Sequence, residues 1–298
     1  RIAKKAGMKG LILTAKHHDG FALYPSKYTT HSVAKSPWKN GKGDVVKDLS
    51  EACKKYGLKL GIYLSPWDRF HPAYGTDDYN QVYAKMQEEL LTNYGPIFEF
   101  WYDGANGEGP NGKKQVYDWN LFHSMVNKYQ PNAVQFSDAG PDIRWVGNER
   151  GYAYDTMWSP ILRDKIYPGC PDFDNYRNGQ ENGTHWVSPE VDVSIRPGWY
   201  YHPEQDDKVK AFLVTEDLKN EEYVNSHYII MATKKGQVKK TALEQYSRPR
   251  TNGINAITIK EDDELLEAKL TTGESQVMLA LKSGKAIRFE EAKTRPMG

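Results

Sequence analysis

The sequence predicts an α/β fold: a partial (β/α)8 TIM-like barrel over residues 1–208, followed by an all-β segment over residues 209–298. Three observations predict this fold. Short apolar runs alternate with helical patterns in the first segment, and polar or aromatic side chains follow each run. All eight Trp residues lie before residue 200, whereas the residues after 208 form short β-branched runs rich in charge, which places the boundary near 208–211.

Four runs in the first segment have the length and composition of buried strands, namely residues 10–18, 58–68, 96–104 and 132–138. Helical patterns separate them at residues 44–57, 79–94 and 115–129. The first helical pattern begins after Asp44, a good N-cap, and ends at Gly57, a good C-cap. Strand, helix and strand in repetition predict a parallel sheet, either open and doubly wound or closed as a barrel.

The side chains that follow the four strands favour the barrel. They are His17, His18 and Asp19 after the first strand, Trp67 and Asp68 after the second, Trp101 and Asp103 after the third, and Ser137 and Asp138 after the fourth. In a barrel all strand ends converge on one funnel, whereas an open sheet uses mainly its switch point. No glycine-rich phosphate loop follows any strand, so nucleotide binding is disfavoured.

Each of these side chains also has a purely structural interpretation. Paired histidines can cap loop carbonyls, a Trp can pack on a barrel rim, and Asp103 precedes Gly104 in a frequent turn dipeptide. Taken together, carboxylates, neutral hydrogen-bonding groups and indoles at one rim are typical of a carbohydrate site.

Composition excludes several other classes. A net charge of +1 gives no global reason to expect nucleic acid as a partner, and the chain is too polar for a membrane protein. Cys53 and Cys170 form no C-x-x-C pattern, which argues against a disulfide scaffold and a zinc site, so we expect no metal. The chain begins in the last turns of a helix, so we expect it to start inside a domain.

Three motifs then become recognisable: KHHDGF with the following LYPSKYTTHSV stretch, EFWYDG, and SPEVDVSIRPGW. In this order and spacing, residues 1–207 resemble the α-L-fucosidases of glycoside hydrolase family 29. The resemblance implies a (β/α)8-like barrel and retaining hydrolysis of terminal α-L-fucosyl residues of glycans without a cofactor. It also implies a periplasmic or extracellular location.

The resemblance implies roles for individual residues. Asp103 matches the nucleophile, and His17 and His18 match the pair that binds fucose hydroxyls. Glu149 in WVGNERGYA resembles the acid/base of the subgroup that acts on α-1,3- or α-1,4-linked fucose, and we choose it over Glu181 and Glu190. Further substrate-binding residues implied by the resemblance or expected around it are Tyr63, Trp67, Trp101, Arg196 and Trp199.

The second segment reads as strands joined by tight turns. The runs HYIIMAT, INAITI, LLEAKLT, SQVMLALK and KAIRF are strand-like, and turns are expected at Gly236, Gly273 and Gly284. ATKKGQVKKT at 232–241 recurs as ALKSGKAIRF at 280–289, a repeat typical of propeller blades. These stretches and YSRPRTNGINAI resemble the C-terminal domain of the DNA gyrase A subunit, a β-pinwheel that wraps DNA.

That second resemblance implies an alternative function, a DNA-binding fragment of a cytoplasmic type II topoisomerase. Weak DNA contact would then run through residues 234–250, with Lys234, Lys235, Lys239, Lys240, Arg248 and Arg250 as phosphate contacts. A solvated basic face is the simpler interpretation, because acidic stretches offset these charges. We hypothesise that the chain is a chimera, natural or artefactual, whose first segment lacks strands before Arg1 and after Trp199 and whose second has about two blades.

Overall fold

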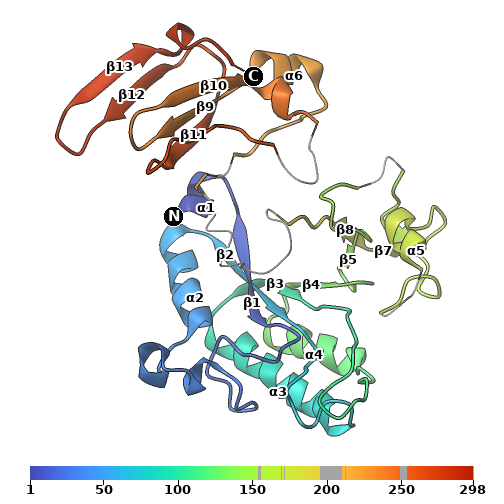
Figure 1. Ribbon diagram of the computed structural model, residues 1–298. Coiled ribbons are helices and arrows are strands. Elements are labelled where there is room, and N and C mark those ends of the chain that lie inside the picture. Colours follow the sequence, from blue (N-terminus) through green and yellow to red (C-terminus); the bar gives the residue numbers. More distant parts are fainter. Residues whose placement is uncertain are drawn as a thin grey trace. The chain divides into compact units, whose positions relative to one another are not determined.

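The computed structural model describes residues 1–153, 156–168, 170, 172–194, 210–211, 213–248 and 254–297 (Figure 1). The chain divides into two compact units, Lys9–Ile195 and the combination of Arg1–Met8 with Arg196–Gly298. The predicted boundary at residue 208 lies outside the described residues. The short helix α1 (Ile2–Lys5) belongs to the second unit.

The first unit is built on a six-stranded sheet. Its strands are β1 (Gly10–Lys16), β2 (Lys59–Leu64), β3 (Ile97–Trp101), β4 (Val134–Ser137), β5 (Ile143–Trp145) and β8 (Ser188–Glu190). They lie side by side in that order, and every neighbouring pair is parallel. The predicted parallel sheet and its first four strands are confirmed. The strands β5 and β8 were not predicted, since three residues are too few to show a period.

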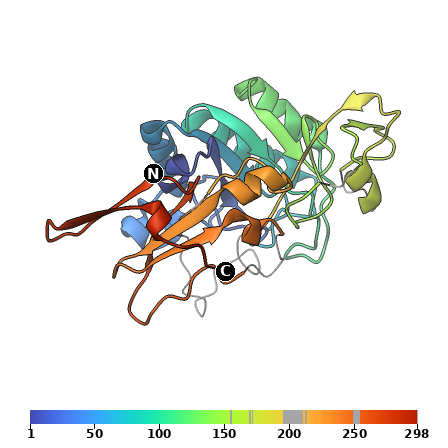
Figure 2. The ribbon, with the colours of Figure 1, turned by 90° about the horizontal axis from the view of Figure 1, so that it is seen from above.

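Three helices connect the first four strands, namely α2 (Val45–Tyr56), α3 (Asp78–Asn93) and α4 (Trp119–Tyr129). Figures 1 and 2 show them, in blue to green, next to strands β1 to β4. The Asp44 side chain accepts a hydrogen bond from the backbone N–H of Lys47, and Gly57 ends α2 with φ 64°, as predicted. Helix α4 begins four residues later than expected, because Asp118 caps it.

The strands run in chain order and the sheet curls around one face. Two strands, β4 and β5, separate Trp101 in β3 from Glu190 in β8 in the sheet order, yet the indole Nε1 of Trp101 donates to Oε1 of Glu190 at 2.9 Å. Among the described residues, β1 and β8 are the two edges of the sheet. That these strands belong to an eight-stranded barrel therefore stays a prediction.

A small subdomain interrupts the chain between β5 and β8. It contains β6 (Pro160–Ile161), α5 (Phe173–Asn178) and β7 (His185–Trp186), with β6 and β7 antiparallel. The buried Arg144 of β5 donates to the backbone carbonyls of Trp158, at 2.9 Å, and of Tyr176. These hydrogen bonds tie the subdomain to the sheet.

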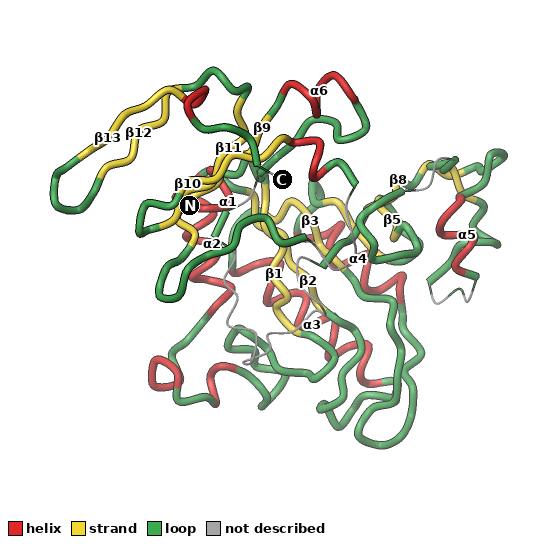
Figure 3. The backbone as a smooth tube through the Cα atoms, turned by 45° about the horizontal axis from the view of Figure 1, so that its top comes forward, coloured by secondary structure: helices red, strands yellow, loops and turns green. Residues whose placement is uncertain are grey.

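Besides α1, the described part of the second unit contains antiparallel strands and the short helix α6 (Glu221–Ser226). The strands β9 (Tyr228–Thr233), β10 (Val238–Ala242) and β11 (Leu265–Thr271) form one sheet, and β12 (Gln276–Ala280) pairs with β13 (Ala286–Glu290) in a separate hairpin (Figure 3). The three predicted turn glycines all have positive φ, as tight turns require.

One predicted strand of this unit is wrong. Residues 254–259, the INAITI run, form no strand, whereas the more polar QVKKT run forms β10. The side chains of Gln237, directly before β10, and of Lys239 in β10 donate to the backbone carbonyls of Thr258 and Ala256, at 3.1 and 3.0 Å. These carbonyls are therefore bonded to side chains and are not part of a strand ladder. No helix in the described parts of the chain has the length and apolar character that a membrane crossing needs.

Candidate active site

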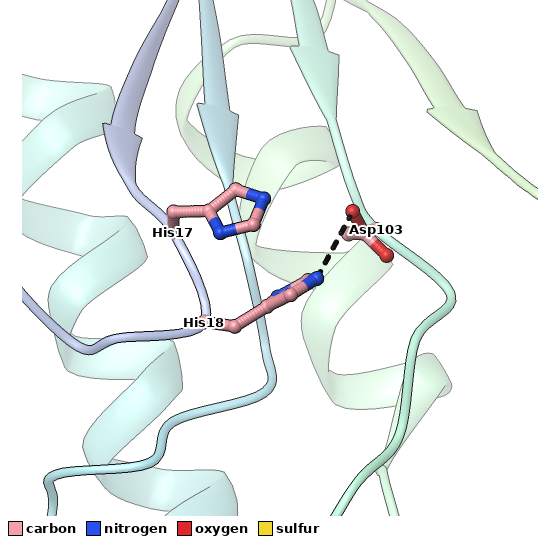
Figure 4. Close-up of side chains that lie close together, drawn as sticks. All are labelled: His17, His18 and Asp103. Carbon is pink, nitrogen blue, oxygen red and sulfur yellow. Dashed lines mark ion pairs between the residues drawn. The ribbon is translucent and has the colours of Figure 1, made fainter. Parts of the chain in front are cut away.

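Two imidazoles and a carboxylate meet at the carboxyl ends of β1 and β3. His17 and His18 directly follow β1, and Asp103 lies two residues beyond β3 (Figure 4). One ligand atom from each of the three lies within 4.8 Å of the others, and His18 Nε2 is 3.8 Å from Asp103 Oδ2. The predicted convergence of these strand ends is present.

Two donors hold the carboxylate of Asp103. The hydroxyl of Tyr63 in β2 donates to Oδ2 at 2.6 Å, and the backbone N–H of Ala105 donates to Oδ1 at 2.8 Å. One donor on each oxygen fixes the plane of the carboxylate and leaves lone pairs for a further interaction. The Asp103 side chain is 22% exposed, so solvent or a ligand can reach it.

Aromatic rings from four consecutive strand ends line the same face. His17 stacks on Tyr63 with ring centroids 5.7 Å apart, Tyr63 on Trp101 at 4.9 Å, and Trp101 on Phe136 at 4.0 Å. The strand register explains the series, because Tyr63, Trp101 and Phe136 are Cα partners across β2, β3 and β4. The result is a stack of rings beside a carboxylate, in which Phe136 is fully buried and His17, Tyr63 and Trp101 are partly exposed.

Trp67 lies on the other side of the histidine pair. Its ring centroid is 4.6 Å from that of His18, and its indole N–H donates to the carbonyl of Glu108 at 3.0 Å. The predicted residues His17, His18, Tyr63, Trp67, Trp101 and Asp103 are thus brought together.

Ser65 orients His18, and sequence reasoning missed it. Its hydroxyl donates to the carbonyl of Trp67 at 3.2 Å and lies 2.7 Å from Nδ1 of His18. Which of the two atoms donates in this short contact depends on the tautomer of the imidazole. Burial lowers the pKa of His18 to about 4, against the opposing effect of Asp103, and burial also lowers the pKa of His17. Both imidazoles are therefore neutral near pH 7.

A buried ion pair lies beside the loop that follows β1 and carries the histidine pair. Lys16 Nζ lies 3.3 Å from Asp68 Oδ2, and neither side chain is exposed. Lys16 also donates to the carbonyl of Trp67, at 3.2 Å, which connects the pair to the loop after β2. Gly20 has φ 79°, and a Cβ there would lie 2.4 Å from Asp68 Oδ1, so the glycine of the HHDG motif lets the two loops approach. The sequence did not predict this ion pair, because Lys16 ends β1 whereas Asp68 follows β2, and nothing in the local pattern relates them.

Several carboxyl groups surround Asp103. Burial raises the pKa of Asp138 to about 7, and Asp103 adds to the effect. Burial also raises the pKa of Asp192 to about 7, with further contributions from Glu190 and Glu149. Burial, together with a hydrogen bond to Glu190, raises the pKa of Glu99 to about 8. Part of the acidic cluster is thus uncharged near neutral pH.

Comparison with known proteins decides the family. The family model described as alpha-L-fucosidase matches residues 1–216. The chain belongs to this α-L-fucosidase family. It is 49% identical over 209 residues to alpha-L-fucosidase 1 of Arabidopsis thaliana, which covers 70% of this chain and 41% of that protein. The chain therefore spans about two fifths of this relative.

Solved structures agree with the α-L-fucosidase assignment. A glycoside hydrolase 29 family member from an unknown rumen bacterium is 47% identical, with a TM-score of 0.62, and the match covers 68% of this chain and 38% of that one. A Ruminococcus gnavus glycoside hydrolase 29 fucosidase solved in complex with fucose is 34% identical, with a TM-score of 0.59, over 68% of this chain and 46% of that one.

The C-terminal segment is similar to another protein. The family model of the DNA gyrase C-terminal domain, a beta-propeller, matches residues 227–272. The gyrase A subunit of Buchnera aphidicola is 47% identical over 85 residues, which are 28% of this chain and 10% of that protein. The gyrase A-like character of this segment is thereby supported.

The remaining predicted fucosidase residues are Glu149, Arg196 and Trp199. Glu149 is an exposed residue in the loop after β5, and it acts electrostatically on Asp192. Glu181, which we did not choose, is exposed in a turn. Arg196 and Trp199 lie outside the described residues.

The predicted phosphate contacts of the gyrase-like segment are largely engaged within the protein. Lys234 pairs with Glu264, and Lys239 donates to a backbone carbonyl. Lys240 is buried, pairs with Glu291 at 3.1 Å and lies over the ring of Tyr228. The prediction for Lys240 is wrong, since a buried and paired ammonium cannot reach a phosphate. Arg250 is not among the described residues.

Proposed function

We propose that the first segment is the catalytic part of a retaining α-L-fucosidase that removes terminal α-L-fucosyl residues from glycans. The observation that carries this proposal is the carboxylate of Asp103, oriented by Tyr63 and Ala105 and adjacent to two neutral imidazoles. The fucose complex of the Ruminococcus gnavus relative supports fucose as the sugar. Activity is a proposal because the chain spans only part of its relatives.

In the first step, an oxygen of Asp103 attacks the anomeric carbon of the fucosyl residue. The new C–O bond forms as the glycosidic bond breaks, and Glu149 gives its proton to the departing oxygen. The hydrogen bonds from Tyr63 and Ala105 keep the carboxylate aimed at that carbon.

In the second step, Glu149 takes a proton from water, and the water oxygen attacks the same carbon and releases Asp103. Two inversions give net retention, so the product is initially the α anomer. The two carboxyl groups of a retaining glycosidase lie about 5 to 5.5 Å apart. The carboxyl group of Glu149 must therefore come to this distance from that of Asp103 when the substrate is bound.

The neutral imidazoles suit the recognition of sugar hydroxyls. A neutral imidazole carries one N–H donor and one lone pair, so each histidine can form a hydrogen bond with a sugar hydroxyl. The partly exposed rings of His17, Tyr63 and Trp101 offer apolar contacts to the sugar.

The assignment of Glu149 as acid/base has a direct test. Glu149→Gln and Glu190→Gln are compared on an aryl α-L-fucoside whose phenol leaves without protonation, with and without azide. If Glu149 is the acid/base, azide accelerates only Glu149→Gln and yields α-L-fucosyl azide, because azide needs no base to attack the covalent intermediate. Rescue of Glu190→Gln alone would transfer the role to Glu190, which lies next to Trp101.

The linkage preference and the cellular location are extensions of the same proposal. Glu149 as acid/base would place the enzyme with those acting on α-1,3- or α-1,4-linked fucose, and the fucosidase relationship suggests a periplasmic or extracellular location. Comparing release of fucose from linkage-defined oligosaccharides tests the first point. Proteolysis or labelling of surface-exposed protein on intact cells tests the second.

DNA binding is the second candidate, favoured by the gyrase-like sequence of residues 227–272. The internal pairing of Lys234, Lys239 and Lys240 predicts that any binding is weak. Titration of duplex DNA at low and physiological salt tests it, since a basic rim that neutralises several phosphates loses affinity steeply with salt. Tight, salt-sensitive binding would favour the wrapping function.

We also propose that the two segments have separate origins. The fucosidase match ends at residue 216 and the gyrase match begins at residue 227. Amplification across codons 200–220 from source DNA distinguishes a natural fusion, which gives one product, from an assembly artefact, which gives none.

A further inference from the structure

Glu99 is a buried acidic residue that the reaction outlined above does not use. It lies in β3 two residues before Trp101, and its side chain is on the inner face of the sheet, in register with Gly61 of β2 and Val134 of β4. It is only 6% exposed. An ionised carboxylate so placed is costly unless a cation or several donors stabilise it.

The groups that face Glu99 are acidic. Glu190, in β8, raises the pKa of Glu99 through a hydrogen bond and its charge, and Asp192 does so through its charge, whereas the register neighbours Gly61 and Val134 carry no charge. Among the described residues no lysine or arginine is paired with Glu99 or Glu190. A hydrogen bond between two carboxyl groups requires that one of them holds a proton.

The contacts place that proton on Glu99. Glu190 already accepts the indole N–H of Trp101 on Oε1 at 2.9 Å. Oε1 of Glu99, by contrast, has no hydrogen-bond partner among the described residues. A carbonyl oxygen of a protonated acid tolerates this more easily than a carboxylate oxygen, because it carries less charge.

We propose that Glu99 is a positioning residue: its protonated carboxyl group donates to Glu190 and holds it where it accepts the indole N–H of Trp101. The consequence reaches the reacting carboxylate. Trp101 stacks on Tyr63, and Tyr63 donates to Asp103, so the orientation of the indole bears on the partly exposed rings beside Asp103. This inference rests on the proposed fucosidase function and adds a residue that does not touch the substrate.

The proposal also predicts a pH dependence. Burial, and then Glu190 and Asp192, raise the pKa of Glu99 to about 8. Above that pH the pair carries two negative charges that repel each other, so the hold on Trp101 weakens and the alkaline limb of the activity profile should include this step.

Two substitutions of Glu99 distinguish a role as hydrogen-bond donor from a role in filling space. Glu99→Gln keeps a donor in its amide, so near neutral pH we expect KM and kcat within about threefold of wild type, with the alkaline loss moved to higher pH. Glu99→Ala removes the donor, and a lost buried hydrogen bond of about 1.5–3 kcal/mol corresponds to a rise in KM of roughly tenfold or more. If Glu99→Gln is as impaired as Glu99→Ala, or keeps the wild-type alkaline limb, the proposal is wrong.

A second measurement does not depend on activity. The full chain labelled with ¹³C at the glutamate carboxyl carbons is titrated by NMR, with Glu99→Gln to assign the signal and Glu51→Gln, on the exposed face of α2, as the control. We expect one glutamate signal with a midpoint near pH 8 that is missing only in Glu99→Gln. A Glu99 midpoint near the ordinary value of about 4.3 would overturn the proposal. If the chain hydrolyses no fucoside but Glu99 titrates near pH 8, the proposed fucosidase function is wrong and the proposed pairing of Glu99 with Glu190 is still supported.

Discussion

The hydroxyl of Tyr63 donates a hydrogen bond of 2.6 Å to Oδ2 of Asp103. Because the acceptor is charged, we expect Tyr63→Phe to lower kcat/KM by about tenfold to a hundredfold, the equivalent of about 1.5–3 kcal/mol. Steady-state kinetics on an aryl fucoside measures it. Tyr94→Phe is the matched control, since its hydroxyl bonds to Asp44 at a helix cap. Equal kinetics for both variants would remove Tyr63 from the site.

Neutral His18 makes the stability of the first unit dependent on pH. Burial lowers its pKa from 6.5 to about 4, so between these values the unfolded chain binds a proton that the folded chain does not. The resulting stability is present above pH 6.5 and is lost as the pH falls through 4. We expect the melting temperature of His18→Gln to fall less between these pH values than that of wild type. Parallel curves would contradict the assignment.

The same three side chains could also hold a cation. Two imidazole nitrogens and a carboxylate oxygen within 4.8 Å of one another suit Zn²⁺. The proposed reaction uses Asp103 as a free nucleophile, so we expect a chelator to leave activity unchanged and added Zn²⁺ to inhibit. Inhibition should weaken in His17→Gln. Loss of activity on chelation, with recovery on adding zinc, would point instead to a metal-dependent reaction.

We expect the buried ion pair of Lys16 and Asp68 to affect mainly the free energy of unfolding. Asp68→Ala leaves Lys16 buried without its partner, which should cost about 3–5 kcal/mol. Asp48→Ala is the control, because its ion pair with Lys39 is exposed and should cost about 1 kcal/mol or less. Urea unfolding followed by tryptophan fluorescence compares them, since all Trp residues precede residue 200. Similar midpoints for both variants would show that Lys16 is solvated when Asp68 is absent.

Periodicity and strand-end chemistry were enough to predict the first four strands, their helices and the group around Asp103. These features are local, because an apolar run and the polar residue after it are read within about ten residues. Ser65, Asp68 and Glu99 escaped prediction because their roles depend on partners 47 to 91 residues away. The strand predicted at INAITI failed for a related reason, since its carbonyls accept hydrogen bonds from the distant side chains of Gln237 and Lys239.

The central claim is that Asp103 attacks the fucosyl residue in this chain. Release of p-nitrophenol from p-nitrophenyl α-L-fucoside by the purified protein, with Asp103→Ala alongside, tests it most directly. We predict activity in wild type and a loss of at least about a thousandfold in Asp103→Ala. Equal rates for the two proteins, or a soluble and folded wild type without activity, would contradict it.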